Sequence, residues 1–245
     1  MNVETAQVTR LGNRDQNQDR ACIISSQSHL LLTLADGMGG HVSGDLAAEA
    51  AVRVLAHDFK GYRDSMDPAD FLHNSIARAH RAVAVLRQDL DPDLRPRTTI
   101  TACVIKADQA HWAHVGDSRV YLIRGRKVVK RTRDHSAVEI MATQGLIAEA
   151  DIANHPLRNF VDQCLGGEPE LPLIEVAQPQ ALLAGDIVLL CSDGFWGPFS
   201  DSYLAHALGE QLELQATLDA LALEAELRSM PVSDNVTAVA IRWQV

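Results

Sequence analysis

Four aspartates stand where apolar runs typical of buried strands begin or end. They are Asp36, Asp117, Asp193 and Asp234. Strand ends are rigid, and the glycines beside three of these acids let backbone carbonyls approach a ligand closely. If these acids converge in space with Asp19, their like charges raise some of their pKa values unless cations compensate. The pattern predicts a site for hard divalent cations such as magnesium or manganese, which prefer oxygen ligands.

The chemistry of such a site is the activation of water. Two divalent ions could hold a hydroxide and neutralise charge on a phosphoryl group, as they do in binuclear hydrolases. Any single Asp-Gly pair is more simply explained as a turn, because both residues are common there. Four acids at strand ends in one chain make that explanation unattractive for the whole set.

Hydrophobic periodicity predicts the elements that position these acids. Strand patterns occupy 5–10, 21–26, 29–35, 98–106, 110–115, 120–124, 128–131, 173–177, 187–191 and 236–243. Helical spacing of apolar residues covers 44–59, 68–90, 136–144 and 214–227. Closely spaced strands joined by short turns pair antiparallel, and Arg124-Gly125-Arg126 is a plausible tight turn. The order of strands, two helices and more strands predicts an α+β fold of packed sheets under helices.

Length and composition favour a single domain over 1–245, with 145–172 as an irregular excursion beside the core. The net charge of −10 disfavours nonspecific binding to nucleic acid or anionic lipid. The longest apolar runs span five residues, against roughly 20 needed to cross a bilayer, so we expect no membrane span. The start of the chain has no apolar stretch typical of a secretory signal. We therefore expect a cytoplasmic protein.

Two further features are open to more than one interpretation. The segment 119–133 carries seven basic residues, which could attract a phosphorylated partner but are more simply the solvated face of a hairpin. Four cysteines, Cys22, Cys103, Cys164 and Cys191, are scattered without CxxC pairs. Neither disulfides nor thiolate zinc is favoured, and packing is the expected role.

Seven short motifs resemble, in their order, those of the metal-dependent protein phosphatase 2C family. They are RDQNQD (14–19), DGMGGH (36–41), RTT (97–99), GDSR (116–119), DHS (134–136), SDG (192–194) and DNVT (234–237). The likeness is to a compact bacterial member and covers nearly the whole chain. It implies a four-layer α-β-β-α sandwich of two antiparallel sheets flanked by helices, with a metal centre at one edge. It also implies removal of phosphate from phosphoserine and phosphothreonine.

The resemblance assigns roles residue by residue. Asp36 matches the aspartate that bridges two Mn²⁺ or Mg²⁺ ions, and Gly37 lends its carbonyl oxygen. Asp193 and Asp234 complete the coordination of one of these ions, and Asp19 matches a residue that organises metal-bound water.

Three more positions take their roles from the same likeness. Asp117 corresponds to an acid that helps to hold a third, weaker ion, and Asn235 adjoins the site. Arg14 matches the phosphate-binding arginine, and its planar donor fork suits two phosphate oxygens.

Two positions depart from the family pattern. Gln18 precedes Asp19 where many members have glutamate, which removes one negative charge near the second metal. Met38 stands where some relatives have a histidine proposed as general acid. His41 is close enough in sequence to substitute; a metal-bound water or an ordinary loop role for His41 are the alternatives.

The remaining motif residues have structural explanations. Ser136 is expected to cap a helix rather than act as a nucleophile, and the 145–172 segment resembles the family's flap, which varies with substrate selection. The expected partners are phosphorylated proteins and a cognate serine/threonine kinase, and we expect a monomer. The alternative is a phosphatase-like module that binds phosphoproteins with weak or no turnover. A small-molecule phosphohydrolase and a purely structural metal binder are disfavoured by the ordered motifs.

Overall fold

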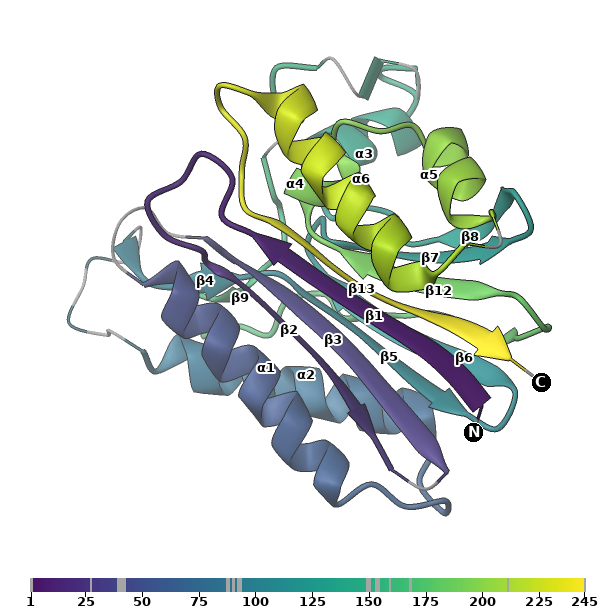
Figure 1. Ribbon diagram of the computed structural model, residues 1–245. Coiled ribbons are helices and arrows are strands. Elements are labelled where there is room, and N and C mark those ends of the chain that lie inside the picture. Colours follow the sequence, from purple (N-terminus) through teal and green to yellow (C-terminus); the bar gives the residue numbers. More distant parts are fainter. Residues whose placement is uncertain are drawn as a thin grey trace.

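The computed structural model describes residues 2–26, 28–38, 43–86, 89, 91, 94–148, 151–152, 155–158, 160–167, 169–210 and 212–244. Two antiparallel sheets lie face to face, and helices cover their outer surfaces (Figure 1). The α+β sandwich predicted from the order of strands and helices is confirmed.

The first sheet has the strand order β1-β13-β12-β7-β8. Its strands are β1 (Asn2–Arg10), β13 (Val236–Gln244), β12 (Ile187–Cys191), β7 (Arg119–Arg124) and β8 (Lys127–Arg131). The two ends of the chain meet here, because Asn2 pairs with Gln244 and Arg10 with Val236. Arg124 pairs with Lys127 across a two-residue connection, which confirms the predicted tight turn at Gly125.

The second sheet has the order β10-β6-β5-β3-β4-β9, with β2 on β3 and β11 on β6. Its longer strands are β2 (Asp19–Ser25), β3 (His29–Met38), β5 (Ile100–Lys106) and β6 (Gln109–Val115). Its two-residue strands are β4 (Arg97–Thr98), β9 (Leu165–Gly166), β10 (Glu175–Val176) and β11 (Gln180–Ala181). The predicted strand 173–177 therefore contributes only β10.

Alternate residues of β3 belong to two different cores, because successive side chains of a strand point to opposite faces. Leu31 packs with the helices α1 (Gly44–Lys60) and α2 (Pro68–Ala84), against Leu55 and Leu72. Leu32 faces the other sheet, in a cluster with Trp112 and Leu190. Both faces of this strand are buried, which fixes the position of Asp36 near its end.

Three helices cover the outer face of the first sheet: α4 (Asp193–Trp196), α5 (Asp201–Leu208) and α6 (Leu214–Ser229). The short helix α3 (Ala137–Thr143) begins at Ser136, whose hydroxyl accepts from the amide of Glu139, as predicted. Helix α2 ends at Ala84, earlier than the predicted 90. Among the described residues, no helix combines the length and the apolar character that a membrane span requires.

Candidate metal centre

Strands from both sheets bring the five predicted acids to one end of the sandwich. Asp19 opens β2 and lies directly opposite Asp36 of β3. In the first sheet, Asp193 follows β12, and Asp234 lies two residues before the neighbouring strand β13. Asp117 precedes β7, which flanks β12 on its other side. The structure therefore gathers side chains that are as much as 215 residues apart in the chain.

Burial and mutual repulsion perturb these acids strongly. Burial, followed by the charges of Asp19 and Asp193, raises the pKa of Asp36 well above its ordinary value. Burial raises the pKa of Asp19 to about 7, and burial with the charge of Asp234 raises the pKa of Asp193 to about 6. The pKa of Asp117 is also raised, first by burial and then by Asp193. Charged carboxylates in this arrangement need a compensating cation.

Two oxygen atoms of the cluster fit such a cation directly. Asp19 Oδ1 and Asp193 Oδ1 are buried and have no hydrogen-bond partner within the described part of the chain. The other oxygen of Asp19 accepts from Ser192 Oγ at 2.9 Å. A buried carboxylate oxygen without a partner destabilises the fold, because it has lost its hydrogen bonds to water and has not replaced them. Hard oxygen donors left open in this way suit Mn²⁺ or Mg²⁺.

Gly37 lies where the backbone segments of the site come closest. A side chain at Gly37 would place its Cβ 2.1 Å from the carbonyl oxygen of Gly44 and 2.8 Å from that of Gln18. The Gly37 amide donates to the same Gln18 oxygen at 3.2 Å. Only glycine fits here, which supports the close backbone approach expected of a carbonyl ligand.

Arg14 lies at the rim of the cluster. Its Nη2 donates to Asp234 Oδ2 at 2.7 Å, and both side chains remain partly open to solvent. The guanidinium is thus held next to one predicted metal ligand while it stays accessible to a phosphate.

Asn235 anchors the loop that carries Arg14 and Gln18. Its Nδ2 donates to the carbonyl oxygens of Leu11 at 2.8 Å and Gln16 at 3.1 Å, and its Oδ1 accepts from the Gln18 amide at 2.8 Å. A position predicted only to adjoin the site therefore fixes the path of the chain into Asp19.

The turn that carries Asp117 is joined to Asp36 through Thr99, a residue to which we assigned no role. Thr99 Oγ1 accepts from the Asp36 amide at 3.0 Å and is 2.8 Å from Ser118 Oγ. On the other side, Trp196 Nε1 donates to the carbonyl oxygen of Asp117 at 3.1 Å. Thr99 and Ser118 belong to the RTT and GDSR motifs, but the motifs do not show which groups these side chains bond to, because the partners lie far away in sequence.

Gly116 is expected to tolerate no side chain, because its φ is +106° and a Cβ would come within 2.6 Å of Thr99 Cγ2. Gly116→Ala should lower the free energy of unfolding by about 2–3 kcal/mol, from backbone strain and overpacking together. Gly125→Ala is the matched control, since the φ of Gly125 is +57° and a Cβ there would have no neighbouring atom within 4 Å. It should cost only about 1 kcal/mol. Urea unfolding compares the two, and equal costs would show that contact with Thr99 does not matter.

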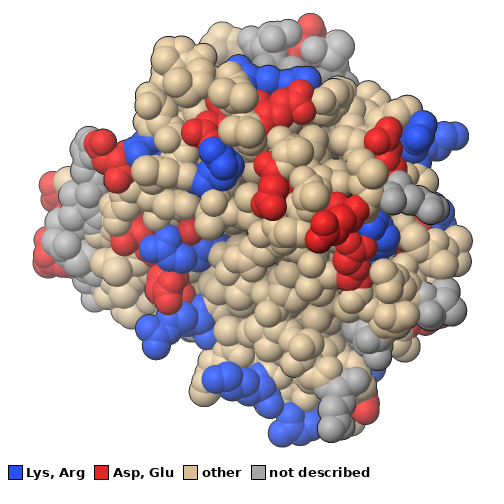
Figure 2. All heavy atoms as spheres, in the orientation of Figure 1, with Lys and Arg blue, Asp and Glu red and all other residues tan. Residues whose placement is uncertain are grey.

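The basic segment 119–133 is largely neutralised within the molecule. Arg119, Arg124 and Arg131 donate to Asp134, Asp186 and Asp201 respectively. Figure 2 shows both signs of charge interspersed over the visible face. These ion pairs favour the structural interpretation of the segment as a hairpin over a docking site.

The four cysteines are free, and Cys103 and Cys191 are buried. Burial raises the pKa of all four thiols, that of Cys22 to about 11. Thiols of this kind stay protonated near neutral pH and are poor nucleophiles. His41, the predicted alternative acid, lies outside the described residues. Met38 ends β3.

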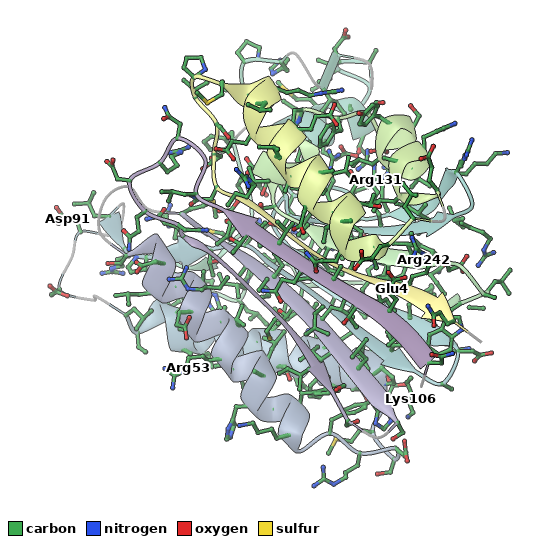
Figure 3. The ribbon with its side chains drawn as sticks, in the orientation of Figure 1. Glu4, Arg53, Asp91, Lys106, Arg131 and Arg242 are labelled. Carbon is green, nitrogen blue, oxygen red and sulfur yellow. The ribbon has the colours of Figure 1, made fainter. Side chains whose placement is uncertain are left out.

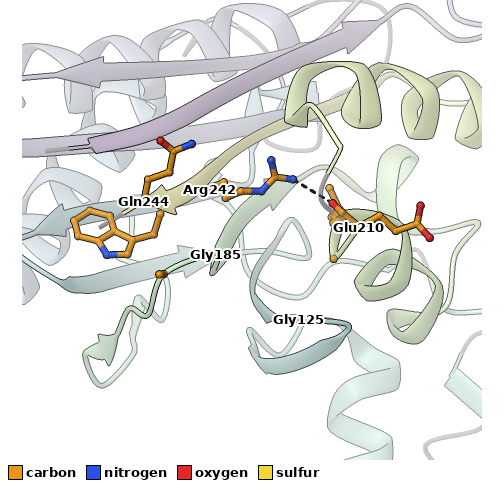
Figure 4. Close-up of a pocket in the computed structure, with 9 residues that line it drawn as sticks. Gly125, Gly185, Glu210, Arg242 and Gln244 are labelled. Atoms are coloured by element: carbon orange, nitrogen blue, oxygen red, sulfur yellow. Dashed lines mark hydrogen bonds between the residues drawn. The ribbon is translucent and has the colours of Figure 1, made fainter.

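The opposite end of the same strands holds a cavity of about 570 Å³, lined by Gly125, Gly185, Gly209 and Arg242 among others (Figure 4). Arg242 Nη1 donates to Glu4 Oε2 at 2.6 Å, and the two residues lie side by side on β13 and β1 (Figure 3). Its Nη2 donates to the carbonyl oxygen of Glu210 at 3.4 Å. The cation in this cavity is thus already paired, and the acids of the candidate centre are at the other end.

Comparison with known proteins agrees with this geometry. The family model described as protein phosphatase 2C matches residues 7–230. The serine/threonine protein phosphatase PstP of Mycobacterium tuberculosis is 33% identical over 85% of this chain, which spans only 39% of that protein's length.

Solved structures show the same fold. The serine/threonine phosphatase Stp1 from Staphylococcus aureus superposes with a TM-score of 0.91 at 26% identity, covering 100% of this chain and 96% of the other. The catalytic domain of PstP in complex with two manganese ions gives a TM-score of 0.82 at 28% identity, covering 99% of both chains.

The fold and the match over most of the chain define the class: this chain belongs to the protein phosphatase 2C family. Members of this family are metal-dependent serine/threonine phosphatases that use manganese or magnesium.

Proposed function

We propose that this chain hydrolyses phosphoserine and phosphothreonine in proteins, with divalent cations held by Asp36, Gly37, Asp193 and Asp234. Asp19 and Asp117 complete the centre. The observation that carries the proposal is the buried acid cluster with two oxygens, Asp19 Oδ1 and Asp193 Oδ1, that have no hydrogen-bond partner among the residues that the structure describes. Such a cluster is costly without cations and matches their ligand preference.

The chain's own residues supply binding and orientation. When bound, two Mn²⁺ or Mg²⁺ ions would neutralise phosphoryl charge and activate a water for attack on phosphorus. Arg14 donates to the phosphate oxygens from the rim, and Ser192 orients Asp19 through its hydroxyl. A covalent phosphoenzyme on a cysteine or on Ser136 is disfavoured, because burial raises the pKa of the thiols and Ser136 caps α3.

The direct test measures hydrolysis by the purified full chain. With Mn²⁺ it should cleave p-nitrophenyl phosphate and a phosphothreonine peptide, and EDTA should abolish both activities. Hydrolysis that persists in EDTA would contradict the metal mechanism. Binding of the phosphopeptide without turnover would favour the phosphoprotein-binding module, which the neutral Gln18 and the apolar Met38 suggest.

Arg14→Ala should raise KM for a phosphothreonine peptide about tenfold or more, since two charge-assisted hydrogen bonds are lost. Binding of Mn²⁺ should be retained, because the change removes a cation from Asp234 rather than a ligand. Arg10→Ala is the control, as Arg10 pairs with Glu226 outside the cluster. Steady-state kinetics and calorimetry measure the two effects. Loss of Mn²⁺ binding in Arg14→Ala would contradict the assignment.

The wider setting is also part of the proposal. The substrates are phosphoproteins made by a serine/threonine kinase of the same cell, and the enzyme acts as a monomer in the cytoplasm. The free cysteines support a reducing compartment. The 145–172 segment, whose described part exposes Leu146, Leu157 and Phe160, supplies the contacts that select substrates.

A further inference from the structure

A second cluster of titratable residues lies directly behind the Asp117 turn. It consists of His114 at the end of β6, His135 just before α3, and Glu175 of β10. One donor atom of each lies within 4.8 Å of the others, and the two imidazole rings are 4.5 Å apart. Both histidines are buried. These residues are distinct from the acids of the proposed metal centre.

The hydrogen bonds of the two rings fix where their protons lie. His114 Nε2 is 2.7 Å from the carbonyl oxygen of Arg133, so this nitrogen carries a proton. His135 Nδ1 accepts from the Gly116 amide at 3.3 Å, so a neutral His135 has its proton on Nε2. A metal would need the lone pair of that same Nε2. The arrangement therefore favours a contact with the Glu175 carboxylate, 3.6 Å away, over a metal site.

His135 also binds the same turn through its backbone. Its amide donates to the Gly116 carbonyl oxygen at 2.9 Å, so both polar groups of Gly116 are held by one residue. The carbonyl oxygen of His135 accepts from the Asp162 amide at 2.8 Å. In sequence, His135 precedes the 145–172 segment and Glu175 follows it, whereas Asp162 lies within it. Asp117 directly follows the glycine that His135 holds.

We propose that His135 is a positioning residue: its Nδ1 holds the Gly116 amide and thereby keeps Asp117 in the acid cluster. Through Asp162 and Glu175 the same residue ties this turn to the middle of the 145–172 segment and to β10, which follows it. The inference rests on the proposed function, because it takes Asp117 as the ligand of the third, weaker ion.

Three substitutions separate the two contacts of the His135 ring. Asn offers Oδ1 near the position of Nδ1, so His135→Asn keeps an acceptor for Gly116 and loses the contact with Glu175. Gln places its amide near Nε2, so His135→Gln keeps the contact with Glu175 and loses the acceptor. His135→Ala loses both. His80→Gln is the matched control, since His80 Nδ1 likewise accepts a buried amide, that of Gly166, at 3.2 Å.

The measurement is Mn²⁺ binding to the purified full chain, in which electron paramagnetic resonance detects the free Mn²⁺. Melting temperatures confirm that each variant is folded. We expect His135→Gln, His135→Ala and Asp117→Asn each to weaken the weakest Mn²⁺ site about fivefold or more. His135→Asn and His80→Gln should stay within about twofold of wild type. The double variant His135→Ala/Asp117→Asn should match Asp117→Asn in kcat/KM.

Three results would overturn the inference: equal losses in His135→Asn and His135→Ala, unchanged weak binding in His135→Gln, or an additive loss in the double variant. Failure of the proposed function is distinguishable. In that case the wild type itself would lack tight Mn²⁺ binding and metal-dependent turnover, whatever the His135 variants show.

Discussion

Asp36→Asn is expected to lower Mn²⁺-dependent turnover at least about a thousandfold, equivalent to roughly 4 kcal/mol of transition-state stabilisation. Asp36 interacts with the charges of all four other acids, and the change removes its negative charge without changing its size. The fold should persist, because the bonds to Thr98 and Thr99 involve the backbone of Asp36. Steady-state kinetics with a phosphothreonine peptide measures the loss.

The matched control is Asp108→Asn, which changes an exposed aspartate in the turn between β5 and β6. It should leave turnover within about twofold of wild type. If the Asp36→Asn protein folds and keeps more than a tenth of wild-type activity, Asp36 is not an essential metal ligand.

Asp19→Asn is expected to stabilise the metal-free protein, and the gain should grow as the pH rises from 5 to 8. The folded-state pKa of Asp19 is about 7, against an ordinary value of 3.8, so between these values the folded state binds more protons than the unfolded state. The stability that wild type draws from the protonated carboxyl is therefore lost as the pH rises towards 7. Asn keeps an acceptor for Ser192 and carries no charge.

The measurement is the difference in melting temperature between wild type and Asp19→Asn, in EDTA at pH 5, 6.5 and 8. Buried histidines such as His114, whose pKa is lowered by burial, have the opposite pH dependence, but they cancel in this difference. We expect the difference in melting temperature to be several degrees larger at pH 8 than at pH 5. With saturating Mn²⁺ the sign should reverse at pH 8. A difference that is independent of pH would contradict the electrostatic interpretation of the cluster.

Much of the candidate site could be predicted because its acids mark the ends of apolar runs. The runs before Asp36 and Asp193 and after Asp234 are short and strongly apolar, so the strand ends are readable in the sequence. That these ends meet depends on the pairing of β13 with β12 and of β2 with β3, which no local pattern specifies. The ordered family motifs supplied that information.

The anchors of the site could not be predicted, because they are bonds between distant side chains and backbones. Thr99 and His135 belong to the RTT and DHS motifs and Trp196 to none, yet the local sequence does not show that these residues hold the Asp36 and Asp117 segments. The early end of α2 has a local cause. Helical spacing continues past Ala84, whereas the Val85 amide already bonds to Val83 rather than to a residue one turn back.

The most direct measurement is a crystal structure grown with Mn²⁺, with anomalous scattering used to locate the ions. We predict two manganese peaks bridged by the Asp36 carboxylate, with Asp193 and Asp234 on one of them. Peaks only elsewhere, for example between His114, His135 and Glu175, with the five aspartates free of metal, would contradict the account.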